Sequence, residues 1–258
     1  MTGFVIVIGV LGVVIGSFVN VVALRIPAGG TLLGRSHCPS CQATLTGLDL
    51  VPIASWVVLR GRCRHCQAPV SSSYAVVEAT CGALFAVLAI HFERHAVLAP
   101  YLLLAAGLLA LSVVDLREYR LPDVIVGPLT VAVVAGFGAV ALIDGRGDAF
   151  ARALEAGLAA LAGLGLLHLA FPAGMGFGDV KLAFVLGVAT GWVSWGALAL
   201  SLFLAATLGA VVGILGAVVK GEAIRGRKLP FGPFLAAGTL LAAVIGPSFL
   251  DWYSRLGH

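Results

Sequence analysis

Charged residues are scarce in this sequence, and so are long polar segments. Asp, Glu, Lys and Arg make up 11% of the 258 residues, against about a quarter in soluble domains, while 60% are hydrophobic. So many apolar side chains cannot all be buried in one soluble core, which excludes an ordinary soluble protein. Alternating strand patterns are also scarce, which argues against a membrane β-barrel. We therefore expect an all-α polytopic membrane protein.

Long apolar stretches are what the sequence has instead. A spanning helix needs about 20 mostly apolar residues. The first stretch has no basic segment before it and no small-residue cleavage site after it, so we expect a retained span rather than a signal peptide. The sixth is short and interrupted by glycine. Together the stretches predict about eight transmembrane helices, over 4–24, 74–92, 96–114, 123–143, 150–171, 179–191, 194–219 and 231–248.

Positive charge is unevenly distributed among the segments that connect these stretches. Cytoplasmic loops of membrane proteins carry an excess of lysine and arginine. An outside N-terminus gives the cytoplasmic side twelve basic residues: Arg25, Arg35, Arg60, Arg62, Arg64, Arg117, Arg120, Lys181, Lys220, Arg225, Arg227 and Lys228. The other side receives four: Arg94, Arg146, Arg152 and Arg255. We therefore predict a multi-pass protein with its N-terminus outside.

Only the segment 25–73, between the first and second stretches, is long and polar enough to fold outside the membrane. It carries the pairs CPSC (38–41) and CRHC (63–66), separated by 21 residues, 42–62. Four thiolates favour a tetrahedral structural zinc site, which would stabilise an insert too small for a large core. A cytoplasmic location disfavours the alternative of two disulfides, and free thiols are a further one. We predict zinc on Cys38, Cys41, Cys63 and Cys66. His37 and His65 flank these cysteines and could substitute as ligands, but with four thiols available we expect them to be bystanders.

Two aspartates lie at the edges of apolar stretches, where a carboxylate is costly and by default indicates function. Asp115, in LSVVDLREYRLPD, ends the third stretch, and Asp179, in GMGFGDVKL, opens the sixth. If their helices pack together, one carboxyl keeps its proton while the other ionises. Such a pair can activate water against a peptide carbonyl. The nearby Gly174, Gly176 and Gly178 would admit an extended substrate.

Each aspartate also has a structural interpretation. Asp179 and Asp123 each lie near a predicted helix N-terminus. Capping and the helix dipole favour a carboxylate there. Asp115 lies at a helix C-terminus, where negative charge is disfavoured, although Arg117 and Arg120 offer compensation. A proton-coupled transporter would use the same carboxylates, and an assembly factor would use the insert to bind a partner. Glu78, within the second stretch, either lines the site or faces the insert.

Taken together, these motifs resemble the type IV prepilin peptidases, the bifunctional leader peptidase/N-methyltransferases, which are relatives of the GxGD-type membrane aspartic proteases. On this resemblance Asp115 and Asp179 match the catalytic pair, the four cysteines match those linked to zinc, and Gly61 and Arg62 match a step implicated in methyl transfer. The resemblance covers nearly the whole chain and is carried by GSFVNVVALRIP (16–27), VPIASWVVLRGRCRHC (51–66), VVDLREYRLPD (113–123), GFGDVKL (176–182) and PFGPFLAAG (230–238).

The resemblance also implies a reaction and a place. The enzyme would cut the basic leader of prepilins or pseudopilins after a glycine, at the cytoplasmic face of the bacterial inner membrane, in type IV pilus or type II secretion systems. It would then methylate the new N-terminus with S-adenosylmethionine. Its surroundings would be membrane lipid, with no nucleic-acid partner. Its parts would be a first helix (1–24), the zinc-binding insert (25–73) and a seven-helix peptidase domain (74–258).

Two departures from the family pattern fall in or next to the insert. Ser73 and Ala75 replace the usual Arg and Pro, and Leu50 replaces the Asn of an Asp-Asn pair that begins here with Asp49. No glycine-rich nucleotide loop is visible, so the residues alone predict no S-adenosylmethionine site. A monofunctional peptidase without methylation is therefore the first alternative, and a non-enzymatic transporter or assembly factor is the second.

Overall fold

The computed structural model describes residues 1–93, 95–172, 175–220 and 229–256, and their side chains apart from Lys220 and 247–256. Of the residues used above, Arg94, Gly174, Arg225, Arg227 and Lys228 lie outside these ranges, as do the side chains of Lys220 and Arg255.

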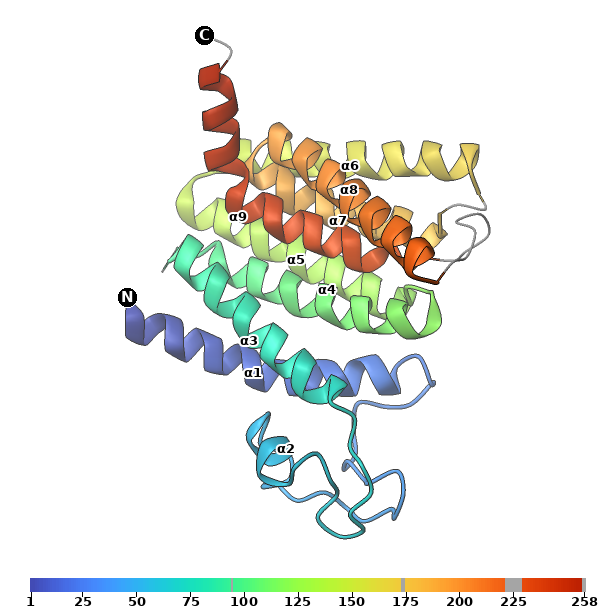
Figure 1. Cartoon of the computed structure of the whole chain (residues 1–258). Coiled ribbons are helices and arrows are strands. Elements are labelled where there is room, and N and C mark those ends of the chain that lie inside the picture. Colours follow the sequence, from blue (N-terminus) through green and yellow to red (C-terminus); the bar gives the residue numbers. More distant parts are fainter. Residues whose placement is uncertain (94, 173–174, 221–228, 257–258) are drawn as a thin grey trace. The chain divides into compact units, whose positions relative to one another are not determined.

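Within the described ranges the chain is helical, and its β-structure is limited to two isolated bridges. It divides into two compact units, Met1–Leu98 and Ala99–His258 (Figure 1). The helices are α1 (Thr2–Arg25), α2 (Ala54–Val58), α3 (Ser73–Phe92), α4 (Leu98–Glu118), α5 (Asp123–Asp144), α6 (Gly147–Ala170), α7 (Phe177–Val193), α8 (Trp195–Lys220) and α9 (Gly232–Leu256).

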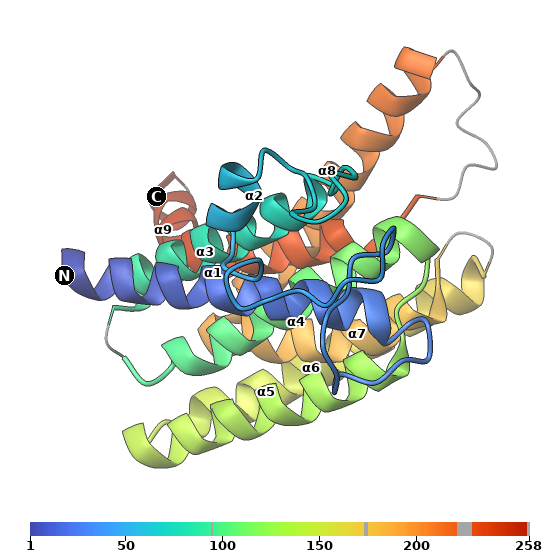
Figure 2. The same cartoon turned by 90° about the horizontal axis from the view of Figure 1, so that it is seen from below.

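In the first unit, α1 packs closely against α3 (Figure 2). Glycines make this approach possible, because a Cβ on Gly16 would lie 2.7 Å from the Cα of Glu78, and one on Gly12 would lie 2.7 Å from the Cβ of Phe85. Helix contacts in lipid commonly use small residues in this way. The buried Asn20 of α1 donates a hydrogen bond of 3.1 Å to the carbonyl of Tyr74 at the start of α3. This bond fixes the register of the two helices.

The insert between α1 and α3 has little regular structure beyond α2. It contains two knuckles with the same backbone pattern, each enclosed by one of the isolated bridges, His37–Thr44 and Arg62–Pro69. The N–H of Cys38 donates to Ala43, and the N–H of Cys63 donates to Ala68, both at 2.9 Å. The two knuckles therefore share one local backbone geometry.

Glu78 joins the insert to α3. Its Oε2 atom accepts a hydrogen bond of 2.7 Å from the N–H of Ile53, immediately before α2. Of the two predicted roles for this buried carboxyl, contact with the insert is therefore the one observed.

In the second unit, α7 is the central helix, packing against α5, α6, α8 and α9. Most of its side chains are buried. The buried Tyr101 of α4 donates a hydrogen bond of 2.7 Å to the carbonyl of Ala189 in α7, and its ring meets Phe137 of α5 edge-on. These contacts tie α4 and α5 to the central helix.

A helix lies at each of the eight predicted apolar stretches. Among the described residues, α1, α3, α4, α5, α6 and α8 are long and apolar enough to cross a membrane. The remaining two are shorter apolar segments, α7 with 17 residues and the part of α9 from Gly232 to Gly246. The predicted all-helical membrane architecture with a cysteine-bearing insert is confirmed, while the number of eight crossings and the division at 24 and 73 stay predictions.

Candidate functional site

Asp115 lies in the last turn of α4, and 5% of it is exposed. Its Oδ2 atom accepts a hydrogen bond of 2.9 Å from the N–H of Gly232, the first residue of α9. The N-terminus of a helix carries partial positive charge and free N–H groups, both of which favour a carboxylate. The unfavourable end of α4 is thus offset by the favourable end of α9, a partner that the sequence does not indicate.

Asp179 lies in the first turn of α7, and 7% of it is exposed. Its Oδ2 atom accepts a hydrogen bond of 3.2 Å from the N–H of Gly176, just before the helix. This is the capping interaction expected for an acidic residue at a helix N-terminus. The interaction uses one carboxylate oxygen, so capping and a chemical role are compatible.

The structure brings these two carboxyl groups together, close enough for their charges to interact. Leu121, in the link between α4 and α5, fills the space between their helices. A Cβ on Gly178 would lie 2.9 Å from that of Leu121, and a Cβ on Gly232 would lie 3.2 Å from its Cδ2. Glycines before Asp179 and opposite Asp115 therefore let three helix ends converge around the pair.

Asp123 is engaged differently. Its carboxylate pairs with Lys181 at 2.7 Å, and 67% of its side chain is exposed. The pair links the start of α5 to the first turns of α7. Nearby, Arg120 is bonded to Glu118 at 2.6 Å. Neither contact places Asp123 beside a second buried carboxyl, so Asp115 and Asp179 are the candidate pair.

The four cysteines of the insert form a candidate zinc site. Their Sγ atoms all lie within 4.8 Å of one another, and the cluster found among the described residues contains no histidine. The Sγ atoms of Cys38 and Cys66 are 3.8 Å apart. Tetrahedral zinc with bonds of about 2.3 Å separates its sulfur ligands by about 3.8 Å. The donor set and its spacing therefore fit one structural zinc ion.

Backbone donors prepare two of these thiols for metal. The N–H groups of Cys41 and Ser40 lower the pKa of the Cys38 thiol to about 6. Those of Cys66 and His65 likewise lower the pKa of the Cys63 thiol. The thiolate is the form that binds metal. Each knuckle thus stabilises the charged form of its first cysteine.

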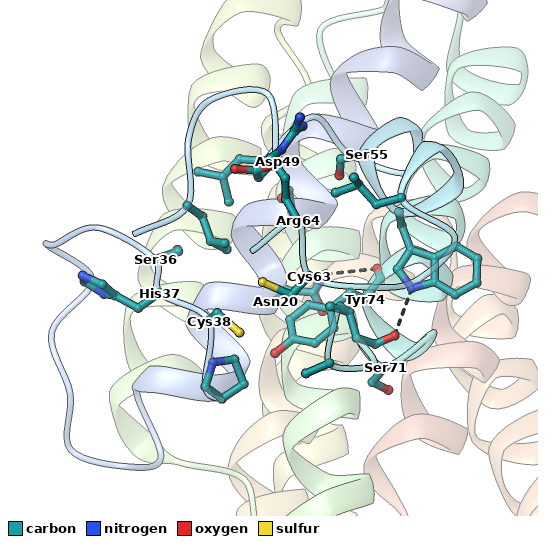
Figure 3. Close-up of a pocket in the computed structure, with 18 of the residues that line it drawn as sticks. Asn20, Ser36, His37, Cys38, Asp49, Ser55, Cys63, Arg64, Ser71 and Tyr74 are labelled. Atoms are coloured by element: carbon teal, nitrogen blue, oxygen red, sulfur yellow. Dashed lines mark hydrogen bonds and ion pairs between the residues drawn. The ribbon is translucent and has the colours of Figure 1, made fainter. Parts of the chain in front are cut away.

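Gly61 and Arg62, predicted to act in methyl transfer, lie at the second knuckle. Gly61 has a φ of +65°, and a Cβ there would lie 3.0 Å from the indole ring of Trp56. Arg62 lines a cavity of about 730 Å³ within the first unit (Figure 3). Asn20 and Tyr74 also line it. Sequence reasoning did not anticipate this cavity, because its walls come from segments far apart in the chain.

Comparison with known proteins identifies relatives of both parts of the chain. Residues 10–92 match the bacterial peptidase A24 N-terminal domain, and residues 102–214 match the type IV leader peptidase family. No solved structure matches the chain significantly.

Curated relatives match almost the whole chain. A protein of Stutzerimonas stutzeri is 34% identical over 277 residues, covering 96% of this chain and 93% of the relative. One from Burkholderia pseudomallei (strain K96243) is 36% identical over 275 residues, covering 93% and 85%. One from Bacillus subtilis is 30% identical over 248 residues, covering 96% of each. All three are named prepilin leader peptidase/N-methyltransferase.

Proposed function

Because this chain belongs to the type IV leader peptidase family, we propose that it is a membrane aspartic endopeptidase that removes the basic leader of prepilins or pseudopilins after a glycine. The observation that carries this proposal is the convergence of two buried aspartates, Asp115 and Asp179, within the second unit. The relatives' names support the substrate class and a subsequent N-methylation.

Asp115 and Asp179 are the catalytic pair of this proposal. Two carboxyls at short range share one proton, so one acts as base and the other as acid. The ionised carboxyl takes a proton from water, whose oxygen attacks the carbonyl carbon of the scissile glycine. The protonated carboxyl donates its proton to the carbonyl oxygen, giving a neutral tetrahedral diol.

Collapse of the diol restores both groups. The first carboxyl passes its proton to the peptide nitrogen as the C–N bond breaks. The second takes a proton from one hydroxyl, and the carbonyl of the new carboxyl terminus forms. The leader leaves with a free carboxyl group, the mature pilin leaves with a free amine, and the pair returns to its starting state.

We infer the membrane topology from the distribution of charge. Six helices are long and apolar enough to cross a bilayer, and the relatives support a multi-pass protein of the inner membrane. With the N-terminus outside, the basic residues of the insert and those beside both aspartates are cytoplasmic. A substrate leader held in the cytoplasm by its own positive charge would then reach the pair. Lipid surrounds the helices in this arrangement, and no nucleic acid takes part.

Two bound groups belong to the proposal. Zn²⁺ would be held by Cys38, Cys41, Cys63 and Cys66, in a closed structural site that stabilises the insert. S-adenosylmethionine, when bound, supplies an electrophilic methyl group for the new N-terminal amine. The insert with these groups (25–73) and the membrane peptidase domain (74–258) are the functional parts that we propose.

The peptidase is tested by incubating a purified prepilin with the full-length enzyme. Loss of the leader is followed as the change in the prepilin's mobility on a denaturing gel. We expect Asp115→Ala and Asp179→Ala each to lower the cleavage rate by at least a hundredfold, the range of general acid–base catalysis. Asp123→Ala is the matched control, since it removes an aspartate from the same motif, and we expect cleavage within a few-fold of wild type. Wild-type rates in either Asp115→Ala or Asp179→Ala would refute the pair.

Mass spectrometry of the mature pilin tests the second activity separately. An N-terminus heavier by one methyl group indicates methylation, whereas an unmodified amine after complete cleavage indicates a monofunctional peptidase. If the wild-type protein leaves the prepilin uncut, the peptidase assignment itself fails and a carboxylate-dependent transporter becomes the better reading.

A further inference from the structure

The cavity at the junction of α1, α3 and the insert has the properties of a cofactor site. We propose that it binds S-adenosylmethionine, with the carboxylate of Glu78 and the rings of Trp56 and Tyr74 recognising the cationic part of the molecule. This inference rests on the methyl-transfer half of the proposed function and gives it a location.

Size and composition are the first evidence. The cavity has a volume of about 730 Å³, inside the range of about 300–1,000 Å³ typical of small-molecule sites. Its wall comes from the C-terminal half of α1, the start of α3 and both knuckles. Figure 3 shows Asn20 and Tyr74 beside Cys38 and Cys63 around the same space. Aliphatic and aromatic side chains line it together with two carboxylates and four arginines: Asp49, Glu78, Arg25, Arg35, Arg62 and Arg64.

Glu78 supplies negative charge to this wall. It is 7% exposed, and one of its two carboxylate oxygens accepts the N–H of Ile53. The other oxygen has no hydrogen-bond partner among the described residues. Since no fully buried side-chain oxygen there lacks a partner, this oxygen keeps some exposure, and Glu78 lines the cavity. A buried carboxylate with a spare oxygen favours a cationic ligand. The sulfonium and ammonium groups of S-adenosylmethionine are such cations.

Trp56 and Tyr74 add aromatic faces. Trp56 is oriented by a hydrogen bond of 3.1 Å from its Nε1 to the carbonyl of Val70. The hydroxyl of Tyr74 has no partner among the described residues and is available to a ligand. Aromatic faces attract cations and also stack on planar bases. They would therefore suit both the sulfonium and the adenine of the cofactor.

Gly61 and Arg62 gain distinct roles in this site. A Cβ on Gly61 would lie 3.0–3.3 Å from three atoms of the Trp56 indole. Because glycine has no Cβ, the indole ring can pack directly against the backbone at this position. Gly61 is thus a positioning residue that acts through Trp56. Arg62 lines the cavity, and its guanidinium has no ion-pair partner among the described residues. It is the natural partner for the carboxylate of the cofactor.

Direct binding tests the site without relying on activity. Isothermal titration calorimetry with S-adenosylmethionine would be run on the purified full-length, zinc-loaded protein. We expect Glu78→Gln, which keeps an acceptor for Ile53 but removes the charge, to weaken binding roughly tenfold. We expect Gly61→Ala to weaken it by a similar factor because it displaces Trp56.

Matched controls separate a local effect from a folding defect. Glu155→Gln removes an exposed acid elsewhere, and Gly47→Ala adds a methyl in the insert where no atom lies within 4 Å. Both should bind like wild type. Zinc content would be measured in every variant, and one zinc per chain shows that the knuckles remain intact.

The outcomes are distinct. Weaker binding by zinc-loaded Glu78→Gln and Gly61→Ala, with unchanged controls, supports the site. Wild-type affinity in both variants overturns it while leaving methylation in place. A wild-type protein that cleaves prepilin but does not bind S-adenosylmethionine overturns this site and the methylation proposal together, and leaves the peptidase intact.

Discussion

At the scale of single residues, the two buried aspartates are held in place by different devices. Asp179 caps its own helix, a local interaction over three residues. Asp115 is bonded to the start of α9, 117 residues further along the chain. Sequence reasoning found both residues because an acid at the edge of an apolar stretch is costly. It could explain only the local cap, since nothing near Asp115 indicates a distant helix N-terminus.

The first prediction concerns Gly232. A Cβ there would lie 2.9 Å from Oδ2 of Asp115, so Gly232→Ala should displace that carboxyl while keeping the N–H that binds it. Misplacement of a catalytic group by about 1 Å can cost about a hundredfold in rate. We expect prepilin cleavage to slow by roughly ten- to a hundredfold. Gly127→Ala is the control, because no atom lies within 4 Å of its added methyl, and equal loss in both variants would contradict the steric explanation.

The second prediction concerns Asp49. The residue after it, Leu50, is one of the positions where the chain departs from the family pattern. The hydroxyl of Thr46 and the guanidinium of Arg64 lower the pKa of Asp49 from 3.8 to about 2. A carboxyl whose folded pKa is depressed stabilises the fold above its ordinary pKa, and this stabilisation is lost as the pH falls through the folded value. Asp49→Asn should therefore lower the stability of the folded insert by the same amount throughout the range from about pH 5 to 8.

The rate of zinc release to a chelator measures this effect. The ratio of the Asp49→Asn rate to the wild-type rate should exceed one, stay level over that pH range, and fall in high salt, which screens the exposed Arg64. Glu118→Gln removes an ion-pair acid in the second unit and should leave zinc release unchanged. A ratio that drifts steadily with pH would show that another group is responsible.

At the scale of elements, the knuckles were the most predictable part of the chain. Two C-x-x-C pairs specify their own local geometry, and both repeat the same hydrogen bond from cysteine to the residue five positions later. Between the knuckles, sequence reasoning anticipated neither α2 nor the cavity beside it. Glu78 accepts a hydrogen bond from the residue before α2, and Glu78 and Asn20 both line the cavity, yet both lie in helices outside the insert. Contacts of that kind leave no periodic signal.

The third prediction is that zinc removal unfolds the insert alone. Structural zinc contributes about 10–16 kcal/mol in small zinc domains, far more than a five-residue helix and two bridges supply. Chelation, or Cys41→Ser, should expose 25–73 to limited proteolysis while circular dichroism stays strongly helical. Cys81→Ala is the matched control, because that buried cysteine lies outside the cluster and should leave the zinc bound. Unchanged protection without zinc would refute a structural metal.

At the scale of the whole molecule, α7 is the helix whose central position the sequence did not indicate. With 17 residues it is roughly 26 Å long, a little short of a hydrocarbon core of about 30 Å. Its apolar stretch was therefore the weakest of the eight in the sequence. The structure shows why the shortness is tolerated: most of its side chains contact protein rather than lipid. Hydropathy measures how well a segment suits a lipid environment, so it gives a low score to a membrane helix that is surrounded mostly by protein.

The fourth prediction is that α7 nevertheless crosses the membrane, with its aspartate end in the cytoplasm. Reporter domains active only outside or only inside the cell would be fused after Gly47, Gly145 and Ser194. Lys181 near the start of α7 and the basic insert should stay inside, so the fusion after Gly47 reports the cytoplasm and the other two report the exterior. Ser194 is decisive because it directly follows α7. A cytoplasmic signal there, with the other two as expected, would mean that α7 enters and leaves by the same face, and Asp179 would then belong to a re-entrant segment.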